Sequence, residues 1–148
     1  MKVSIGCDHG GYDLKERVKA HLIEQGIEVV DFGTNDLSSC DYPDFGIEAA
    51  KAVAKGEVDK GIVICTTGIG ISIAANKVKG IRCALCSDLT SARLTREHND
   101  ANVLALGAAI VGHLVALDIV DVFLSTDFSG LEKHSRRIAK IKAQEENF

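Results

Sequence analysis

One cysteine stands where a buried strand is predicted to end and a glycine-bearing loop to begin. Residues 61–64 read Gly-Ile-Val-Ile, Cys65 follows them, and Gly68 and Gly70 come shortly after. A run of β-branched residues is typical of a strand covered on both faces, and glycines allow a sharp turn into a helix. The amide N–H groups of such a turn, with the positive end of a helix behind them, favour negative charge. The pattern indicates a thiol beside an anion-binding loop, which suits proton-transfer chemistry.

The other strand cysteines offer a plainer interpretation of Cys65. Cys7, Cys83 and Cys86 occupy similar apolar runs, and a buried cysteine ordinarily serves packing. Cys65 alone adjoins a glycine-rich loop and a helix start, where amides and the helix dipole favour a thiolate. Cys83 and Cys86 have a C-x-x-C spacing, but within one strand their side chains would face opposite sides, and no second pair completes a zinc site. We therefore expect no metal. The loop matches neither a phosphate-binding nor a serine-nucleophile motif.

Asp8 and His9 follow the first predicted strand directly, within the run Asp-His-Gly-Gly. Asp8 either caps the first helix, as Asp often does, or lies at a carbonyl or hydroxyl of a substrate, with His9 near the anionic end of that substrate. The residues leave both interpretations open.

Two further groups of polar residues lie later in the chain. His98-Asn99-Asp100 ends the fourth predicted helix, where a histidine is favoured by the dipole but is also a suitable acid or base near neutral pH. The predicted terminal helix is basic, and it carries Lys133, His134, Arg136, Arg137, Lys140 and Lys142. This is either a solvated charged face or a place where Lys133 or His134, with Arg137 one turn on, binds an anion.

Strand-like apolar runs alternate with helix-like stretches along the chain. The predicted strands are Val3 to Cys7, Glu28 to Phe32, Gly61 to Cys65, Ile81 to Cys86 and Val103 to Leu106. The first helix has Leu14, Val18 and Leu22 on an apolar stripe, with Lys15 among the charged residues elsewhere, and Gly26 ends it. The alternation predicts an α/β fold with a doubly wound, Rossmann-like, five-stranded parallel sheet flanked by helices.

In such a sheet the ligand site lies outside the carboxyl ends of the strands, where Asp8, His9, Cys65 and Thr67 all fall. The polar loop from Gly33 to Asp44 could form one wall of the pocket. The predicted helix from Ile110 to Leu124 is apolar nearly all round, which indicates burial on most sides. Burial against another subunit is our hypothesis for this helix.

Length, composition and net charge exclude several classes of binding partner. A chain of 148 residues fits one domain, and a net charge of -4 provides no field that would attract nucleic acid or an anionic membrane. The absence of Trp argues against a stacking platform for flavin or bases. Five cysteines without a secretory signal indicate reduced thiols and a cytoplasmic protein. The expected partner is a small molecule.

Several motifs taken in order resemble one enzyme family across nearly the whole chain. They are Gly6-Cys7-Asp8-His9-Gly10-Gly11, Asp41-Tyr42-Pro43, Cys65-Thr66-Thr67-Gly68-Ile69-Gly70-Ile71-Ser72-Ile73-Ala74-Ala75-Asn76-Lys77, Gly80-Ile81-Arg82 and Arg96-Glu97-His98-Asn99-Asp100-Ala101-Asn102. The combination resembles type B ribose-5-phosphate isomerase, in a wider family that includes the galactose-6-phosphate isomerase subunits.

The resemblance implies an aldose–ketose isomerase that works through a cis-enediol without a metal or other cofactor, in a single domain over residues 1–148. It implies a homodimer or homotetramer whose sites are shared between subunits. The implied roles are Cys65 as the base, Thr67 and Asp8 for hydroxyl protons, His98 for ring opening, Asn99 and Tyr42 for the sugar, His9 and Arg137 for phosphate, and the loop amides of Gly68, Ile69, Gly70 and Ser72 for the enediolate.

Three departures from the family pattern bear on the substrate. Thr66 stands in the anion loop where the family usually has glycine, Ala109 stands where many members have arginine, and Lys133 is the substitute for an arginine near the end. A lysine is a point charge and lacks the bidentate fork of arginine. Ribose 5-phosphate is the favoured substrate. The alternatives are a six-carbon or other sugar, with or without phosphate, and a non-catalytic sugar-phosphate binding module.

Overall fold

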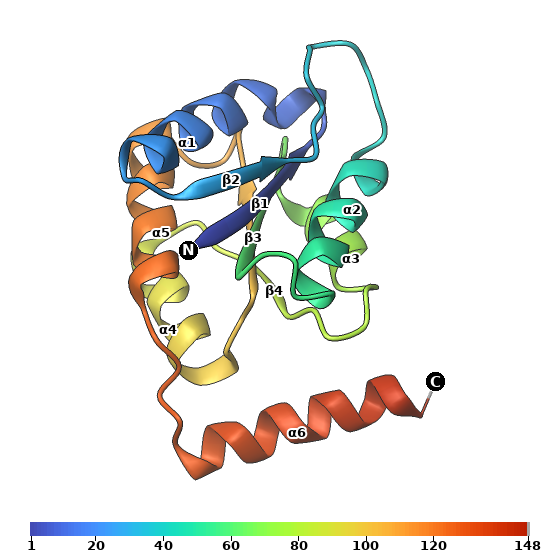
Figure 1. The fold of residues 1–148 in the computed structure, drawn as a ribbon, viewed down its shortest axis with the longest axis vertical. Helices are drawn as coiled ribbons and strands as arrows, with labels where there is room; N and C mark the ends of the chain where they lie inside the picture. The colour runs from blue at the N-terminus through green and yellow to red at the C-terminus, as the bar shows by residue number, and fades with distance from the viewer. Residues whose placement is uncertain (148) are drawn as a thin grey trace.

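A parallel sheet of five strands forms the centre of the molecule, in the order β2-β1-β3-β5-β4 (Figure 1). The computed structural model describes residues 1–147. The strands are β1 (Lys2–Cys7), β2 (Glu28–Asp31), β3 (Lys60–Cys65), β4 (Cys83–Leu85) and β5 (Val103–Gly107). The helices are the 3-10 turn η1 (His9–Gly11), α1 (Tyr12–Glu24), α2 (Tyr42–Ala54), α3 (Ile69–Ala75), α4 (Leu89–Asn99), α5 (His113–Ser125) and α6 (Glu132–Glu146).

Helices cover both faces of the sheet, so the predicted doubly wound α/β fold is confirmed. One core lies between the sheet and α1, α4 and α5, and the other between the sheet and α2 and α3 (Figure 1). Strand register pairs Cys7 with Ile64 and Cys65 with Gly107, so the carboxyl ends of β1, β3 and β5 lie level with one another. The loops after these strands therefore meet at one edge of the sheet, where the direction of winding changes between β1 and β3.

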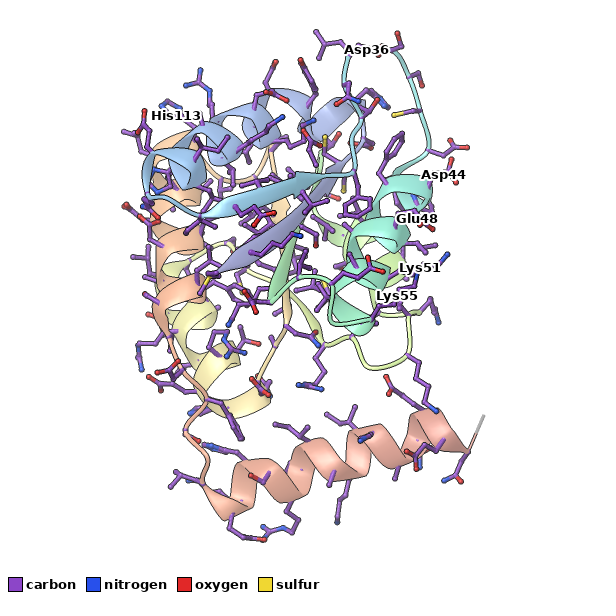
Figure 2. All side chains as sticks on the ribbon, viewed as in Figure 1. Asp36, Asp44, Glu48, Lys51, Lys55 and His113 are labelled. Atoms are coloured by element: carbon purple, nitrogen blue, oxygen red, sulfur yellow. The ribbon has the colours of Figure 1, made fainter. Side chains whose placement is uncertain are left out.

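Charge patterning explains which side of α2 faces solvent. Asp44, Glu48, Lys51 and Lys55 lie on the outer face of this helix, and Lys51 pairs with Glu48 at 2.7 Å (Figure 2). Ala49, Ala50 and Ala52 are buried on the opposite side, against the sheet. No helix within residues 1–147 combines the length and the apolar character that a membrane span requires.

Two predicted element boundaries were wrong. The strand expected over Ile81 to Cys86 is only β4, Cys83–Leu85. As predicted, Cys83 and Cys86 face opposite ways, since Cys83 packs on the core beneath α2 and α3 and Cys86 belongs to the other core. The helix expected from Ile110 begins at His113, because the backbone at Gly112 is extended.

The apolar helix α5 is buried by this chain more than the sequence suggested. Five of its residues, Ala116, Ile119, Val120, Phe123 and Leu124, are buried in the core it shares with α1 and α4. Leu114 and Val115 remain exposed, as does Ile110 before the helix. The apolar surface of α5 is therefore buried largely by other elements of the same chain.

Lys15 was placed wrongly on the charged side of α1, since its side chain is 0% exposed. Its ammonium lies 3.0 Å from Asp31 Oδ2 and donates to the carbonyl oxygen of Thr34 at 2.7 Å. A buried charge is tolerated only when it is paired and hydrogen-bonded. The pair links α1 to the end of β2 and to the start of the following loop.

The terminal helix α6 lies apart from the two layers, across the amino edge of the sheet (Figure 1). His134 is its only buried residue within the described chain. At its far end Glu145 accepts a hydrogen bond from the amide of Gly80 at 3.1 Å. The helix is thus attached near both ends.

Candidate active site

Cys65 ends β3 at the centre of the carboxyl edge, with a side chain that is 4% exposed. The amide N–H of Gly68 donates to its sulfur at 3.1 Å. Burial raises the pKa of Cys7 and of Cys83 to about 12, and that of Cys86 to about 11. Cys65 differs from these cysteines in geometry, because a loop amide donates to its sulfur, whereas the Cys7 sulfur lies against the Thr34 carbonyl.

The loop after Cys65 requires glycine at position 68. Gly68 has φ 76, in the left-handed region, and a Cβ there would lie 2.5 Å from Leu85 Cδ1 and 2.8 Å from the carbonyl carbon of Leu106. The tight turn brings the Gly68 amide back onto the thiol. Local backbone geometry, rather than a side chain, thus positions the donor.

Several loop amides are already used within the loop. Ile69 N–H donates to Thr67 Oγ1 at 3.2 Å, and Ser72 N–H donates to the Gly68 carbonyl at 3.1 Å. The amides of Gly70 and Ile71 make no hydrogen bond within residues 1–147, and no side chain caps α3. In the first turn of α3, these two N–H groups are the ones left to meet a negative oxygen.

Asp8 is both a helix cap and a candidate site residue. It is 6% exposed, and its Oδ1 accepts from Gly11 N–H at 3.1 Å, so the capping role is confirmed for η1. Its Oδ2 has no hydrogen bond among the described residues. One oxygen is therefore fixed by the fold and the other remains for a ligand. The neighbouring His9 accepts at Nδ1 from the amide of Cys40 at 3.2 Å.

Thr66 points toward the loop after β1. A Cβ added at Gly10 would lie 2.1 Å from Thr66 Oγ1, so the threonine occupies the space that glycine leaves open there. On the other side of the loop, the ring of Tyr42 lies against Gly70, where a Cβ would be 2.6 Å from Tyr42 Cζ. Tyr42 is the first residue of α2, so the helix start brings this ring to the anion loop.

His98 and Asn99 lie at the other edge of the sheet. They end α4, which precedes β5, whereas Cys65 pairs with Gly107 at the far end of that strand. At about 3.3 Å per residue the length of β5 separates the two groups by roughly 13 Å. Within one chain, His98 and Asn99 are therefore not brought to Cys65.

The His98 ring packs against His134 of α6, with centroids 4.5 Å apart. His134 Nδ1 lies 2.7 Å from Ser129 Oγ. Burial, and then the charges of His98, Lys133 and Arg137, lower the pKa of His134. His134 is thus a packing partner of His98, while Lys133 and Arg137 are exposed on α6.

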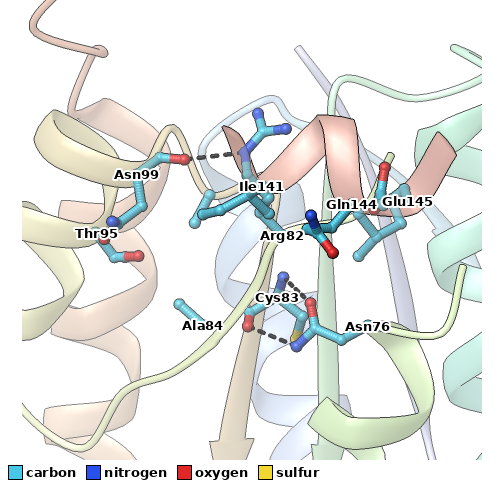
Figure 3. Close-up of a pocket in the computed structure, with 11 residues that line it drawn as sticks. Asn76, Arg82, Cys83, Ala84, Thr95, Asn99, Ile141, Gln144 and Glu145 are labelled. Atoms are coloured by element: carbon cyan, nitrogen blue, oxygen red, sulfur yellow. Dashed lines mark hydrogen bonds between the residues drawn. The ribbon is translucent and has the colours of Figure 1, made fainter. Parts of the chain in front are cut away.

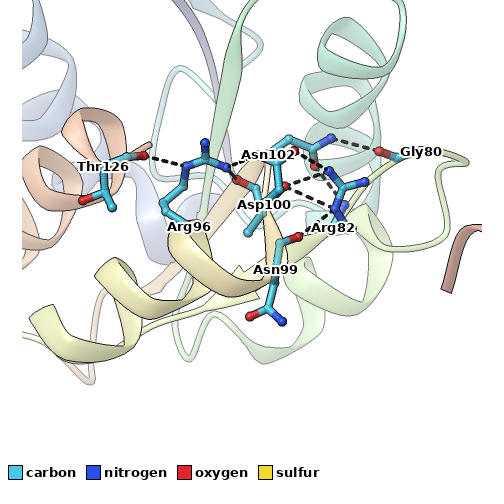
Figure 4. A network of polar contacts seen from close by, with 8 residues as sticks. Gly80, Arg82, Arg96, Asn99, Asp100, Asn102 and Thr126 are labelled. Carbon is cyan, nitrogen blue, oxygen red and sulfur yellow. Dashed lines mark hydrogen bonds and ion pairs between the residues drawn. The ribbon is translucent and has the colours of Figure 1, made fainter. Parts of the chain in front are cut away.

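A polar network fixes the end of α4 (Figure 4). Asp100 has φ 44, and its carboxylate pairs with Arg96 at 2.8 Å. Arg82 donates to the Asp100 carbonyl at 2.8 Å and to the Asn99 carbonyl at 2.9 Å. Because these groups hold the backbone, the His98 and Asn99 side chains are presented outward, and both are exposed.

A cavity of about 620 Å³ lies beside this network, between α6, α4 and β4 (Figure 3). Asn99 and Arg82 line one side, and Ile141 and Gln144 of α6 line the other. Within residues 1–147 no group of three or more His, Cys, Asp or Glu side chains could hold a metal ion.

Sequence reasoning missed the residues that position the site. Lys15 has a signal in the sequence, because it precedes Val18 and Leu22 at helical spacing on the apolar stripe. The helix end expected at His98-Asn99-Asp100 was not missed, because Asp100 is the C-cap of α4 in the left-handed conformation. The contact between Cys40 and His9 is made by backbone and has no signature in residue type.

Comparison with known proteins agrees with this architecture. The model of the family described as Ribose/Galactose Isomerase matches residues 3–141. Ribose-5-phosphate isomerase B of Escherichia coli K12 is 50% identical over 145 residues, covering 98% of this chain and 97% of the relative. The structure of Clostridium thermocellum ribose-5-phosphate isomerase B is 56% identical with a TM-score of 0.98, covering 99% of both chains. That of the Mycoplasma genitalium protein, with bound ribulose-5-phosphate, is 42% identical with a TM-score of 0.95 and covers 99% of this chain and 97% of the other. The chain belongs to the ribose/galactose isomerase family.

Proposed function

We propose that this protein interconverts ribose 5-phosphate and ribulose 5-phosphate through a cis-enediol, with Cys65 as the base. The observation that carries the proposal is the Gly68 N–H donating to Cys65 Sγ at 3.1 Å, at the carboxyl edge of a family member's sheet. The relatives named ribose-5-phosphate isomerase B, one of them with bound ribulose-5-phosphate, support this choice of substrate.

In the proposed reaction the Cys65 thiolate removes the proton from C2 of the open-chain aldose. The C2–H electrons form the C1=C2 double bond, and the carbonyl electrons move onto O1. The free amides of Gly70 and Ile71 would stabilise this enediolate, because preorganised donors act most strongly where charge develops. Thr67 and Asp8, whose Oδ2 is free, would move the hydroxyl protons between them. One proton is delivered to O1 and the other is taken from O2. The Cys65 thiol then returns its proton to C1.

A second copy of the chain would complete this site. His98 is proposed to open the furanose ring, and Asn99 with Tyr42 to bind the sugar. Arg137, helped by Lys133, would bind phosphate together with His9. The roughly 13 Å between the two edges supports a homodimer or homotetramer in which His98 and Asn99 act in the partner's site. One domain over residues 1–148 would carry the activity, and the five free cysteines support a cytoplasmic location.

A six-carbon sugar phosphate is the second candidate substrate. A cavity of about 360 Å³ lies at the carboxyl edge, lined by Gly10, Ala109 and Arg17 among others. Because alanine rather than arginine stands at position 109, this space is not filled by a side chain. A longer substrate would have room there.

Deuterium wash-in tests the proposal directly. Incubation of ribose 5-phosphate with the enzyme in D₂O should place deuterium at C2 of the recovered aldose, and a non-catalytic binding module would exchange none. A kinetic panel of five- and six-carbon aldoses, with and without phosphate, then identifies the substrate. A higher kcat/KM for a six-carbon phosphate would replace ribose 5-phosphate as the assignment.

A further inference from the structure

The loop between β2 and α2 contacts the candidate site through its backbone. The amide N–H of Cys40 donates to Nδ1 of His9 at 3.2 Å, across 31 positions of the sequence. The Cys40 sulfur lies 3.9 Å from the same nitrogen. Cys40 is half-buried, so the contact is partly shielded from water.

This contact determines which nitrogen of His9 carries the proton. A backbone amide can only donate, so the atom facing it must offer a lone pair. With a lone pair at Nδ1, a neutral imidazole carries its proton on Nε2. Nε2 makes no hydrogen bond within residues 1–147, so the ring has one edge held by the protein and one N–H edge for a ligand.

The loop that supplies this amide is anchored at its base. Buried Lys15 donates to the Thr34 carbonyl at 2.7 Å and to Asp31 Oδ1 at 3.1 Å, and Asp31 Oδ1 accepts from Gly33 N–H at 2.8 Å. Burial alone would raise the pKa of Asp31, but the hydrogen bonds from Lys19, Gly33 and Lys15 outweigh it and hold that pKa below its usual value. The ionised Asp31 and its partners fix the backbone at the start of the loop. This limits the positions that the Cys40 amide, further along the loop, can take.

We propose that Cys40 is a positioning residue that acts through its backbone N–H, holding His9 as the neutral Nε2–H tautomer so that His9 meets the anionic end of the substrate as a hydrogen-bond donor rather than as a cation. The part that concerns the substrate rests on the proposed function. The tautomer itself does not, because it follows from the contact alone.

Long-range ¹H–¹⁵N spectra of the imidazole rings test the tautomer in the free enzyme. The chain has five histidines, and the signal of His9 is identified by its loss in His9→Ala. We expect the Nε2–H pattern in the wild type and in Cys40→Ala, which removes the sulfur and keeps the amide. Cys40→Pro removes the N–H, and its His9 should become a mixture of tautomers. An Nδ1–H or doubly protonated His9 in the wild type at pH 7.5 would overturn the proposal, and this result does not require that Cys40→Pro folds.

Kinetics test the consequence for the substrate. Cys40→Pro should raise KM for ribose 5-phosphate by about 5- to 10-fold relative to Cys40→Ala, which is the effect expected from loss of one neutral hydrogen bond. The change in kcat should be smaller. His9→Gln supplies a neutral N–H donor of similar reach, so it should recover most of the KM lost in His9→Ala. If His9→Gln binds no better than His9→Ala, a positive charge is needed and the donor role is wrong. If the wild type turns over no sugar phosphate, the proposed function fails while the spectra still decide the tautomer.

Discussion

The two edges of the sheet are built in different ways. At the carboxyl edge, backbone geometry positions Cys65, because Gly68 turns its amide onto the sulfur and Gly70 leaves space for Tyr42. At the amino edge, side chains do the positioning, since Arg82 and Arg96 bind Asp100 and hold the end of α4. The first edge carries groups suited to proton transfer, and the second carries exposed groups suited to binding a sugar phosphate.

If the proposed roles of Cys65 and His98 are right, one chain holds two half-sites rather than one whole site. The half-sites lie at opposite ends of the same strands, so no side-chain movement within a chain can join them. If the amino edge of a second copy meets the carboxyl edge of the first, two complete sites form at once, because a two-fold interface repeats each contact.

Loss of the carboxyl-edge thiol should have the largest effect. Cys65→Ala removes the proposed base and should lower kcat by about 10²- to 10⁴-fold, the usual contribution of general acid–base catalysis. Cys83→Ala is the matched control, because that thiol lies in a strand but has no loop amide on its sulfur. Steady-state kinetics and deuterium exchange at C2 measure both variants. Equal activities in the two variants would show that Cys65 is not the base.

Mixed dimers of two variants test whether a carboxyl edge and an amino edge from different chains form one site. Cys65→Ala and His98→Asn should each be poorly active alone. In co-expressed dimers that carry two different tags, random pairing should restore roughly one quarter of the wild-type activity, since half of the dimers contain one intact site of two. Purification through both tags in turn enriches the mixed dimer. No recovery in that mixed dimer would mean that each site uses residues of a single chain.

Removal of the anchor beneath the carboxyl edge should cost stability. Asp31→Asn leaves buried Lys15 with only the partly exposed Glu16, 3.2 Å away, as a charged partner, so the free energy of unfolding should fall by up to about 3–5 kcal/mol. Because the pKa of Asp31 is lowered in the folded state, its stabilising effect is present above the unfolded pKa and is lost as the pH falls below about 4. Urea denaturation between pH 3 and pH 7 should therefore show a shallower pH dependence in the variant. An unchanged profile would mean that the pair contributes nothing.

Arg137 of α6 should contribute more to phosphate binding than its neighbour Arg136. Arg136 pairs with Glu132 at 2.6 Å, whereas Arg137 has no ion pair among the described residues. Arg137→Ala should raise KM for the phosphorylated sugar by about 10- to 100-fold, the range for a hydrogen bond to a charged group. Arg136→Ala should leave KM nearly unchanged. A matching loss in both variants would indicate a general effect of charge rather than a phosphate contact.

The smallest expected effect comes from the contact between Gly70 and Tyr42. Gly70→Ala places a methyl group against the Tyr42 ring, whose far end can swing away at a modest cost, so KM should rise by about 3- to 10-fold while the fold is kept. Gly112→Ala is the control, because no atom lies within 4 Å of a Cβ there. Thermal melts and KM measured on both variants separate a displaced ring from a general loss of stability.

The parts of this molecule that follow repeating patterns could be predicted from the sequence. Strand runs such as the one before Cys65 and the apolar stripe of α1 have a period that matches their structure, so the order of elements and the position of the thiol were found. Lys15 was misplaced because residue type alone does not report an ion pair with a distant strand.

The placement of His98 and Cys65 at opposite edges of the sheet also follows from chain order, since His98 precedes a strand and Cys65 follows one. The backbone contact from Cys40 to His9 and the direction of Thr66 could not be predicted. They depend on where loops lead, and loops carry no periodic signal.

The sparse attachment of α6 has a thermal consequence. A helix with one buried residue and contacts near its ends belongs to the least stable part of the molecule, and it can detach while the central sheet remains intact. Cys65 lies on the middle strand, among the last segments to open. If α6 binds phosphate as proposed, the enzyme should on warming lose phosphate binding before its secondary structure melts, so that inactivation precedes unfolding and the lost activity returns on cooling.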